Sequence, residues 1–298
     1  MKNILVVHLV RANNGIETFK RFLDSYHQYP GGVEHDLLIV FKGFGDFQST
    51  KEYKTLLAPF QHLTLEISDE GFDITAYFAA VWCYSEQYRY FCFLNSYSVI
   101  QADEWLRKLH DNITKSGVGL AGASGSWNSH HSNVFNWFIT FGGVVHYQSP
   151  TKKLANIENR PWWKKVISRI KEVPVNTSFL IHFNAFPNYH LRTNAFMISG
   201  EDMLSLKCPV MRTKMDAYKF EGGKHGLTMQ MLKKGKRVIV VGKDGAGYEK
   251  EAWNNSKTFW RFGQENLMVA DNQTRDYQEG TVERRNHLAS LAWDQEKD

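Results

Sequence analysis

The first half of the chain alternates apolar runs of strand length with segments whose apolar residues recur at helical spacing. The apolar runs occupy residues 3–10, 35–41, 62–67 and 90–94. Helical patterns follow them, each after a polar loop, at residues 16–26, 49–60, 74–87 and 102–113. This alternation predicts a parallel, right-handed, doubly wound sheet whose polar loops lie along one edge. Ligands usually bind at such an edge, so these loops are the candidate site.

The second half of the chain is less regular. A short strand is predicted at residues 117–122. The alternation of strand and helix patterns then stops until residue 188, and we interpret this aromatic and basic segment as a helical insertion. Regularity returns with a strand at 189–199, a helix at 225–234 and a strand at 237–241, whereas 248–298 shows no obvious strand. We expect a single α/β domain over residues 1–298, with segments 1–122, 123–188, 189–247 and 248–298.

Composition and charge narrow the class of protein. The 298 residues are 43% hydrophobic, enough to bury a large core. No run approaches about eighteen consecutive apolar residues and the N-terminus lacks a signal-peptide pattern, so we expect a cytoplasmic protein. The net charge of +5 arises in residues 151–175, which argues against a nucleic-acid-binding surface. Cys83, Cys92 and Cys208 follow no disulfide or metal pattern and are predicted to be buried thiols.

An ordered set of motifs gives the chain a resemblance to a known family. After a strand and an Arg-containing loop come Gly71-Phe72-Asp73, then Phe93-Leu94-Asn95-Ser96, then Phe220-Glu221 within Glu-(x)5-Leu-Thr-(x)2-Met-Leu-(x)2-Gly-(x)2-Val. This order resembles nucleotide-sugar glycosyltransferases of the GT-A fold, similar to the bacterial family-two and rhamnan-synthesis-type enzymes. The resemblance covers residues 3–122 and 189–243. It implies a GT-A, Rossmann-like, mostly parallel sheet, with nucleotide-sugar binding in 1–122 and acceptor binding and catalysis in 189–247.

The chain departs from this family at the turn after the fourth strand. In the family this turn is Asp-x-Asp and holds a divalent cation on the donor diphosphate, because Mg²⁺ and Mn²⁺ prefer carboxylate oxygen. Here it is Asn95-Ser96-Tyr97-Ser98, a degenerate form with no carboxylate before Asp103. The pattern implies either a metal-independent enzyme or a weakened activity, and Mg²⁺ or Mn²⁺ stays open as a cofactor. His130, His131 and His146 do not have metal-ligand spacing.

The resemblance and the strand ends together give a donor-binding set. Its members are Arg11, Ala12, Lys42, Asp73, Asn95, Ser96 and Tyr97. Arg11 and Lys42 follow predicted strands and are placed to bind a diphosphate through charge-assisted hydrogen bonds, although each also fits a solvated loop cation. Asp73 matches the position that contacts the nucleotide in the family, and it equally fits the N-cap of the next helix.

The catalytic candidates lie in the second half. Inverting sugar transfer needs a base that takes the proton of the acceptor hydroxyl, and Glu221 matches the one carboxylate retained from the family's Glu-Asp motif. The alternative for Glu221 is a carboxylate at a helix start, stabilised by the macrodipole. Asp216 and His225 are reserve candidates.

Polar residues alternate in the first half of the predicted strand at 189–199. Arg192 and Asn194 fall on one face, where they bind sugar hydroxyls or phosphate, or else form a buried polar pair that satisfies loop carbonyls. Near the end of the chain, Asp271-Asn272-Gln273-Thr274 fits a lid over the donor or an ordinary turn.

Residues 162–171 form an amphipathic pattern on a helical wheel. Trp162 and Trp163 share one arc with three aliphatic residues, and Lys164, Lys165 and Arg169 lie outside it. Such a helix suits an anionic membrane surface and a lipid-linked acceptor, which would place the protein peripherally on the inner membrane face. The alternative is a helix packed on the sheet with solvated cations.

Two functions follow from these observations. The first is an inverting glycosyltransferase of the hexosyl- or deoxyhexosyltransferase class, which moves a sugar from a nucleoside-diphosphate donor to a cell-surface glycan or lipid-linked acceptor. The second is a non-catalytic nucleotide- or sugar-binding relative that kept the fold. A nucleotide-dependent oxidoreductase or kinase is disfavoured, because no Gly-x-Gly-x-x-Gly follows the first strand and no Gly-x-x-x-x-Gly-Lys-Ser/Thr occurs.

Overall fold

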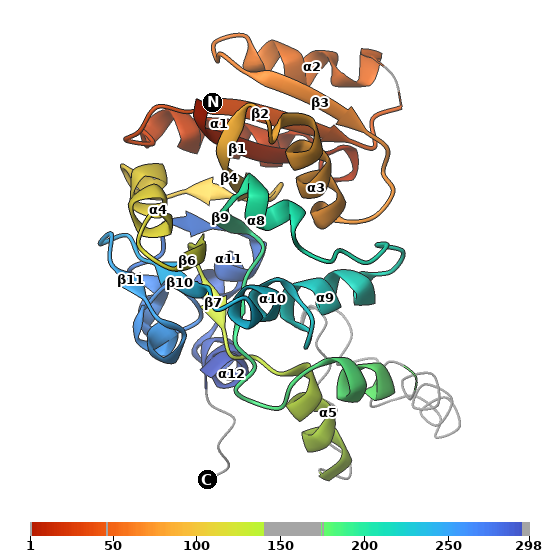
Figure 1. Cartoon of the computed structure of the whole chain (residues 1–298), viewed down its shortest axis with the longest axis vertical. Coiled ribbons are helices and arrows are strands. Elements are labelled where there is room, and N and C mark those ends of the chain that lie inside the picture. The colour runs from red at the N-terminus through yellow and green to blue at the C-terminus, as the bar shows by residue number, and fades with distance from the viewer. Residues whose placement is uncertain (1, 46, 140–173, 175, 294–298) are drawn as a thin grey trace.

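The chain folds into a mixed α/β structure built on one large sheet (Figure 1). The computed structural model describes residues 2–45, 47–139, 174 and 176–293. Within this part of the chain, eight strands join in the order β11-β10-β6-β9-β4-β1-β2-β3. Their bounds are β1 Lys2–Arg11, β2 Asp36–Lys42, β3 Leu63–Ile67, β4 Tyr88–Leu94, β6 Val118–Gly122, β9 Ala195–Ser199, β10 Arg237–Val241 and β11 Gly247–Tyr248.

Most neighbouring strands of this sheet are parallel. Parallel pairing joins β1 to β2 and β4, β2 to β3, and β6 to β10. Strand β9 runs antiparallel to β4 and β6, and β11 antiparallel to β10. The predicted fold class, a mostly parallel sheet flanked by helices, is confirmed. The four apolar runs of the first half are β1 to β4. Strands β1, β2 and β4 are buried on both faces and carry no polar side, whereas β3 is an edge strand whose residues alternate between half-buried and exposed.

Helices cover both faces of the sheet, and smaller elements extend it. The helices are α1 Ile16–Gln28, α2 Phe47–Leu57, α3 Asp73–Tyr84, α4 Trp105–Ile113, α5 His130–Ile139, α8 Gly200–Leu204, α9 Lys214–Gly222, α10 Leu227–Lys233, α11 Asn272–Glu279 and α12 Val282–Trp293. Residues 176–182 are also helical. The 3-10 turns are η1 Ala12–Asn14, η2 Lys250–Asn255 and η3 Phe262–Gln264, and two small sheets pair β5 Val99–Ile100 with β12 Val269–Ala270 and β7 Gly125–Ser126 with β8 His190–Leu191.

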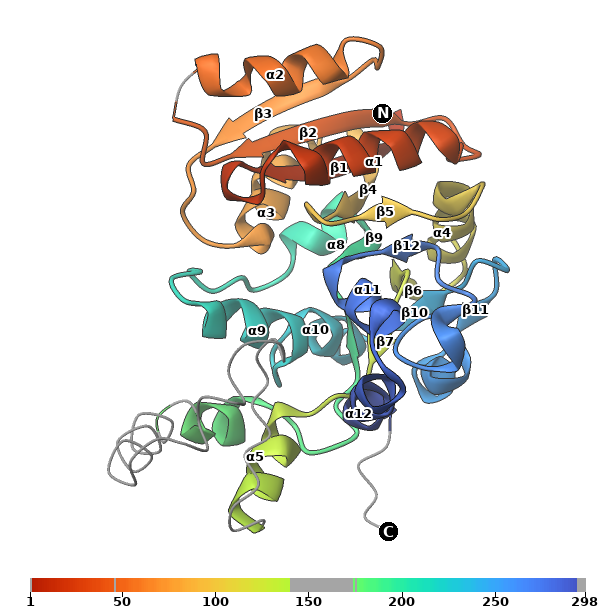
Figure 2. The ribbon, with the colours of Figure 1, turned by 180° about the vertical axis from the view of Figure 1, so that it is seen from behind.

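The core divides between the two faces because successive side chains of a strand point in opposite directions. In β1, Leu5 and Val7 pack on the side of α3, whereas Val6 and Val10 pack on the side of α1, α2 and α4. Figure 2 shows α1 lying in front of β1 on this second face. Each fully buried side chain of this kind contributes about 1.5–3 kcal/mol relative to an exposed one. Both faces therefore fix the strand ends from which the polar loops emerge.

The predicted strand at 189–199 is wrong as one element. It divides into β8 and β9, and residues 192–194 between them leave the sheet. Their backbone groups bond elsewhere: the amide of Arg192 donates to the Ser124 carbonyl at 3.1 Å, and the amide of Thr193 donates to the Glu221 carboxylate at 2.9 Å. The Arg192 and Asn194 side chains are thus displayed by a turn rather than by one face of a strand.

Two further expectations are corrected. The tail after residue 248 does contain a strand, β12, which pairs with β5 across only two residues on each strand, too few to leave a periodic signal. Of the three cysteines only Cys92 is buried, because Cys83 and Cys208 lie on solvent-facing positions of their segments. The amphipathic pattern at 162–171, with Trp162, Trp163, Lys164, Lys165 and Arg169, lies outside the described residues. Among those described, no helix is long and apolar enough to cross a membrane.

Candidate functional site

The connections of the sheet diverge between β1 and β4. From β1 the chain passes through α1 to β2 and on to β3, and then returns through α3 to β4 on the other side of β1. Ligands of open α/β sheets bind at such a switch point, outside the carboxyl ends of the strands. Here those ends carry η1, directly after β1, and the turn Asn95-Ser96-Tyr97-Ser98, directly after β4.

The turn after β4 is closed by its own side chains. The side-chain oxygen of Asn95 accepts hydrogen bonds from the Tyr97 amide at 3.0 Å and from the Ser98 hydroxyl at 3.1 Å. Asn14 of η1 donates to the Ser96 hydroxyl at 2.8 Å and accepts from the Tyr97 hydroxyl at 3.2 Å. The carboxyl ends of β1 and β4 are therefore joined by a neutral hydrogen-bond network.

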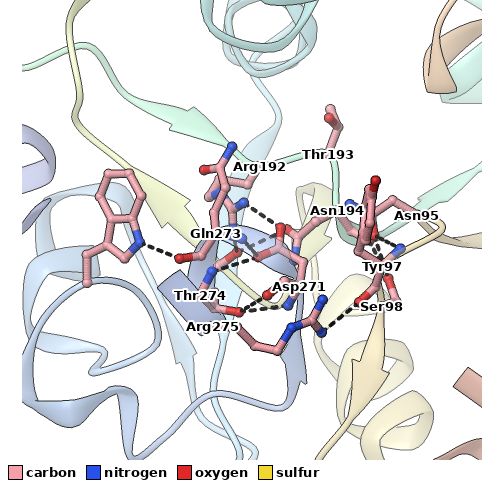
Figure 3. Close-up of polar contacts among 12 residues, drawn as sticks. Asn95, Tyr97, Ser98, Arg192, Thr193, Asn194, Asp271, Gln273, Thr274 and Arg275 are labelled. Atoms are coloured by element: carbon pink, nitrogen blue, oxygen red, sulfur yellow. Dashed lines mark hydrogen bonds and ion pairs between the residues drawn. The ribbon is translucent and has the colours of Figure 1, made fainter. Parts of the chain in front are cut away.

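The residues at this turn do not fit a divalent cation. Hard cations take several oxygen ligands, carboxylates usually among them. The Asn95 oxygen is already used twice within the turn, Asp103 is exposed, and the guanidinium of Arg275 donates to the Tyr97 carbonyl at 3.2 Å (Figure 3). Among the described residues no group of three or more His, Cys, Asp or Glu side chains is placed to hold a metal.

Arg11 and Lys42 lie at neighbouring strand ends, as the sequence indicates, but both are engaged within the protein. Arg11 forms a two-point ion pair with Asp69, at 2.9 and 3.0 Å, and this contact raises the pKa of Arg11. Gly43 permits the approach, because a Cβ there would lie 2.9 Å from the Cβ of Asp69. Lys42 is buried and donates to the carbonyls of Ser68 and Glu70, so it ties down the loop between β3 and α3.

Asp73 faces this pair of cations from the start of α3. The N-cap of that helix is Phe72, so Asp73 is a first-turn carboxylate and not the cap. Burial raises the pKa of Asp73, the charge of Arg11 opposes the rise, and the charge of Glu221 adds to it. Asp73 and Glu221 therefore lie within electrostatic reach of each other, although they come from opposite halves of the chain.

Glu221 lines a cavity of about 70 Å³ beside the switch point. Its first carboxylate oxygen, Oε1, accepts from the Thr193 amide at 2.9 Å and from the Thr193 hydroxyl at 3.2 Å. Its second oxygen, Oε2, accepts no hydrogen bond from the described residues. Helix α9 begins at Lys214, so Glu221 occupies its last turn, where the macrodipole disfavours a carboxylate. Other lining residues are His190, Arg192, Tyr218, Trp260 and Gln273.

Two half-buried histidines of this cavity, His190 and His130, were not predicted as site residues. Burial lowers the pKa of His190, an effect that the charge of Glu221 opposes, and the Nδ1–H of its ring donates to the Asn188 carbonyl at 2.8 Å. Nε2 of a neutral His190 is therefore free to accept a hydrogen bond. Burial also lowers the pKa of His130 to about 4. The only sequence signal for His190 is the polar alternation that it shares with Arg192 and Asn194.

Arg192 and Asp271 form a buried ion pair at the wall of the cavity. The guanidinium lies 2.5 Å from the carboxylate and over the Phe259 ring, with the two side chains 6% and 1% exposed. Asp271 also caps α11 by accepting from the amides of Gln273 and Thr274, so the 271–274 segment is a helix start (Figure 3). Because 79 positions separate the pair in sequence, no local pattern reveals it.

The remaining candidates take structural positions. Asn194 accepts from the Ser124 hydroxyl at 3.1 Å, and its buried amide nitrogen has no partner among the described residues. Asp216 closes a capping box with Thr213 at the start of α9, and His225 is exposed. Neither Asp216 nor His225 lines the Glu221 cavity. Ala12 lies half-buried in η1, whose Asn14 bonds to Ser96 and Tyr97 across the switch point.

No protein-family model matches the chain, and no curated protein matches it. Solved structures resemble parts of its fold. TarS (1–349) of S. aureus is 14% identical with a TM-score of 0.32, over 41% of this chain and 34% of that one. The mannosyltransferase Ktr4p of S. cerevisiae is 10% identical with a TM-score of 0.37, over 78% of this chain and 61% of that one. The 4-diphosphocytidyl-2C-methyl-D-erythritol synthase of Anaerococcus prevotii is 9% identical with a TM-score of 0.44, over 97% of this chain and 97% of that one. The chain thus spans about a third of the length of TarS, and likenesses this weak assign no activity.

Proposed function

We propose that this chain is an inverting glycosyltransferase that moves a sugar from a nucleoside-diphosphate sugar to a hydroxyl of a glycan or lipid-linked acceptor. The observation that carries the proposal is the position of Glu221. Glu221 lines the cavity, and its charge reaches Asp73 near the switch point of the sheet. In this proposal Glu221 is the base and the switch point binds the nucleotide, and their proximity supports sugar transfer, which needs a base close to the donor.

The donor nucleotide occupies the switch point. Asp73 accepts hydrogen bonds from the ribose hydroxyls or from a base N–H, and the sugar projects from Ala12 and the Ser96-Tyr97 turn toward the cavity. There the rings of Tyr218 and Trp260 offer apolar faces to sugar carbons, and Nε2 of His190 accepts from a sugar hydroxyl. In this arrangement Arg192 and Asn194 hold the wall of the cavity in place.

Transfer proceeds by one displacement. The acceptor oxygen attacks the anomeric carbon of the donor, the bond from that carbon to the diphosphate oxygen breaks, and its electron pair leaves with the diphosphate. The hydroxyl proton passes to Oε2 of Glu221, whose position is fixed by the two hydrogen bonds from Thr193 to Oε1. Attack from the face opposite the diphosphate inverts the anomeric configuration.

A ligand panel followed by one substitution tests this function. A nucleotide sugar that binds the native protein raises its melting temperature. With the stabilising donor, Glu221→Gln lowers the rate of transfer or of donor hydrolysis by about 10²- to 10⁴-fold and leaves donor affinity unchanged. The matched control is Glu201→Gln, the same change at an exposed position of α8, which keeps wild-type turnover.

The two possible failures have different meanings. Equal turnover in Glu221→Gln and wild type removes Glu221 as the base. Donor binding without any turnover in the wild type would favour a non-catalytic nucleotide- or sugar-binding protein, an outcome compatible with the self-satisfied turn at Asn95. If no nucleotide sugar binds, the proposed function is wrong.

A further inference from the structure

Arg275 lies at the turn where the family resemblance leads us to expect a metal ion. It is the fourth residue of α11, and its Nη1 donates to the Tyr97 carbonyl at 3.2 Å. Figure 3 shows the guanidinium pointing from α11 toward the Tyr97-Ser98 end of the turn. Sequence alone gave no hint of this contact, because 178 positions separate the two residues.

The charge of Arg275 has no carboxylate partner within the described part of the chain. Its guanidinium has five N–H donors, and the carbonyl of Tyr97 takes one of them. Nearby arginines are paired: Arg192 with Asp271, and Arg284 with Asp276. Burial, and secondly the positive charge of Arg21, lower the pKa of Arg275, and the more distant charges of Asp271 and Glu279 only partly oppose this. A half-buried, unpaired cation next to a second cation is unfavourable unless an anion binds there.

The positive charge at this edge is shared between the two sides of the turn. Tyr97 lies within electrostatic reach of both Arg11 and Arg275, so the two guanidinium groups flank the turn. Arg11 forms an ion pair with Asp69, whereas among the described residues neither Arg275 nor Arg21 forms one, and the carboxylates of Asp271 and Glu279 act on Arg275 only from a distance. The positive charge that no ion pair engages therefore lies on the α11 side of the switch point.

We propose that Arg275 is the cation that binds the diphosphate of the donor, in the place where a divalent metal does not fit. This inference rests on the proposed function. A guanidinium presents a planar pair of donors that matches two phosphate oxygens, which a carbonyl-bound Arg275 can offer with its remaining N–H groups. The same contacts strengthen as negative charge develops on the leaving diphosphate.

The Arg275 side chain is not what holds α11 in place. Asp271 caps the helix, the indole of Trp260 donates to the Gln273 carbonyl at 3.1 Å, and the side chain of Gln264 donates to the Thr274 carbonyl at 2.9 Å. These contacts reach backbone atoms or the cap and survive a change at position 275. Arg275→Met is therefore expected to fold, with a melting temperature close to that of the wild type.

Calorimetric titration in the presence of EDTA tests the inference, with UDP, GDP, dTDP and the corresponding nucleosides as probes. Arg275→Met weakens the diphosphate that binds the wild type by about 10- to 100-fold, as expected for loss of a charged hydrogen-bond donor. Arg275→Lys recovers part of the affinity, and the nucleoside binds all three proteins equally. Arg89→Met is the matched control, because this exposed arginine lies at the opposite, amino end of β4.

The outcomes separate this inference from the function on which it rests. If the wild type and Arg275→Met bind the diphosphate equally in EDTA, Arg275 is not the diphosphate cation. Loss of wild-type affinity in EDTA and its return with Mn²⁺ would also overturn the inference, because a metal would then hold the diphosphate. If the wild type binds none of the diphosphates, the donor site itself is wrong and the inference falls with it.

Discussion

At the switch point, Tyr97 bonds to both Asn14 and Asn95, whereas in the adjacent cavity Glu221 keeps one carboxylate oxygen free of any hydrogen bond from the described residues. Several neutral hydrogen bonds together stabilise the first region. The second relies on one buried ion pair, Arg192 with Asp271, to hold its wall. The two regions also differ in charge, since Arg275 beside the turn forms no ion pair among the described residues, whereas the guanidinium in the cavity wall, Arg192, is paired with Asp271 and Glu221 adds a carboxylate.

This difference suits the turn to a structural role and the cavity to proton transfer. Polar groups that satisfy one another are rigid but have little capacity left for a ligand, whereas a carboxylate held by one oxygen can accept a proton with the other. Under the proposed function, a nucleotide bound at the turn depends on the cations beside it, while the reacting hydroxyl depends on Glu221. The following predictions test the contrast between a distributed network and a single buried pair.

The largest expected effect on stability comes from breaking the buried ion pair. Asp271→Asn retains an N-cap for α11 but leaves the Arg192 guanidinium buried without a counter-charge, and we expect a loss of about 3–5 kcal/mol in the free energy of unfolding. Asp276→Asn is the matched control, because its ion pair with Arg284 is much more exposed, and it is expected to cost at most about 1 kcal/mol. Urea unfolding measures both, and equal losses would contradict the contrast.

Acid is expected to destabilise the cavity side. The pKa of His130 is lowered to about 4 by burial, whereas in the unfolded chain it is about 6.5. Between these values the unfolded chain binds the extra proton, so stability present above pH 6.5 is lost as the pH falls toward 4, by at most about 3 kcal/mol. His130→Phe, which retains the ring stacked on Phe179, flattens this dependence in urea unfolding at pH 7 and pH 4.5. An unchanged slope in His130→Phe would show that His130 is not responsible.

A smaller effect is expected at the turn. Asn95→Ala removes the acceptor for the Tyr97 amide and the Ser98 hydroxyl, yet the bonds from Asn14 remain, so we expect a loss of about 1–2 kcal/mol. Asn95→Asp keeps both acceptor contacts and should cost less. If Asn95→Ala proves more destabilising than Asp271→Asn in the same urea assay, the network at the turn is not distributed.

The sequence was sufficient for the parts of the fold that local pattern determines. Buried parallel strands are continuous apolar runs, so β1, β2, β4 and β10 were located, and the alternating pattern of β3 located the edge strand. The strand predicted at 189–199 failed because the backbone of residues 192–194 bonds to Ser124, Glu221 and Asn95. These partners are distant in sequence, so the hydrophobic periodicity of the segment does not indicate them.

The same limit applies to the site. Glu221 was found through its motif, but Thr193, which orients its carboxylate, was not, and neither were Asp271 as the partner of Arg192 nor Arg275 at the turn. Each of these contacts joins segments far apart in the chain. Side-chain chemistry alone identifies which groups are capable of binding a proton or a phosphate. Only the fold determines which of them are already used by a neighbour.

The central claim, that Glu221 takes the proton of the acceptor, is tested most directly by changing the nucleophile. Azide is already an anion and needs no base, so in Glu221→Gln transfer to a hydroxyl acceptor should fall by about 100-fold or more while transfer to azide proceeds at the wild-type rate. The product is expected to be a glycosyl azide of inverted anomeric configuration. Hydroxyl transfer at the wild-type rate in Glu221→Gln, or an equal loss with both nucleophiles, would contradict the account.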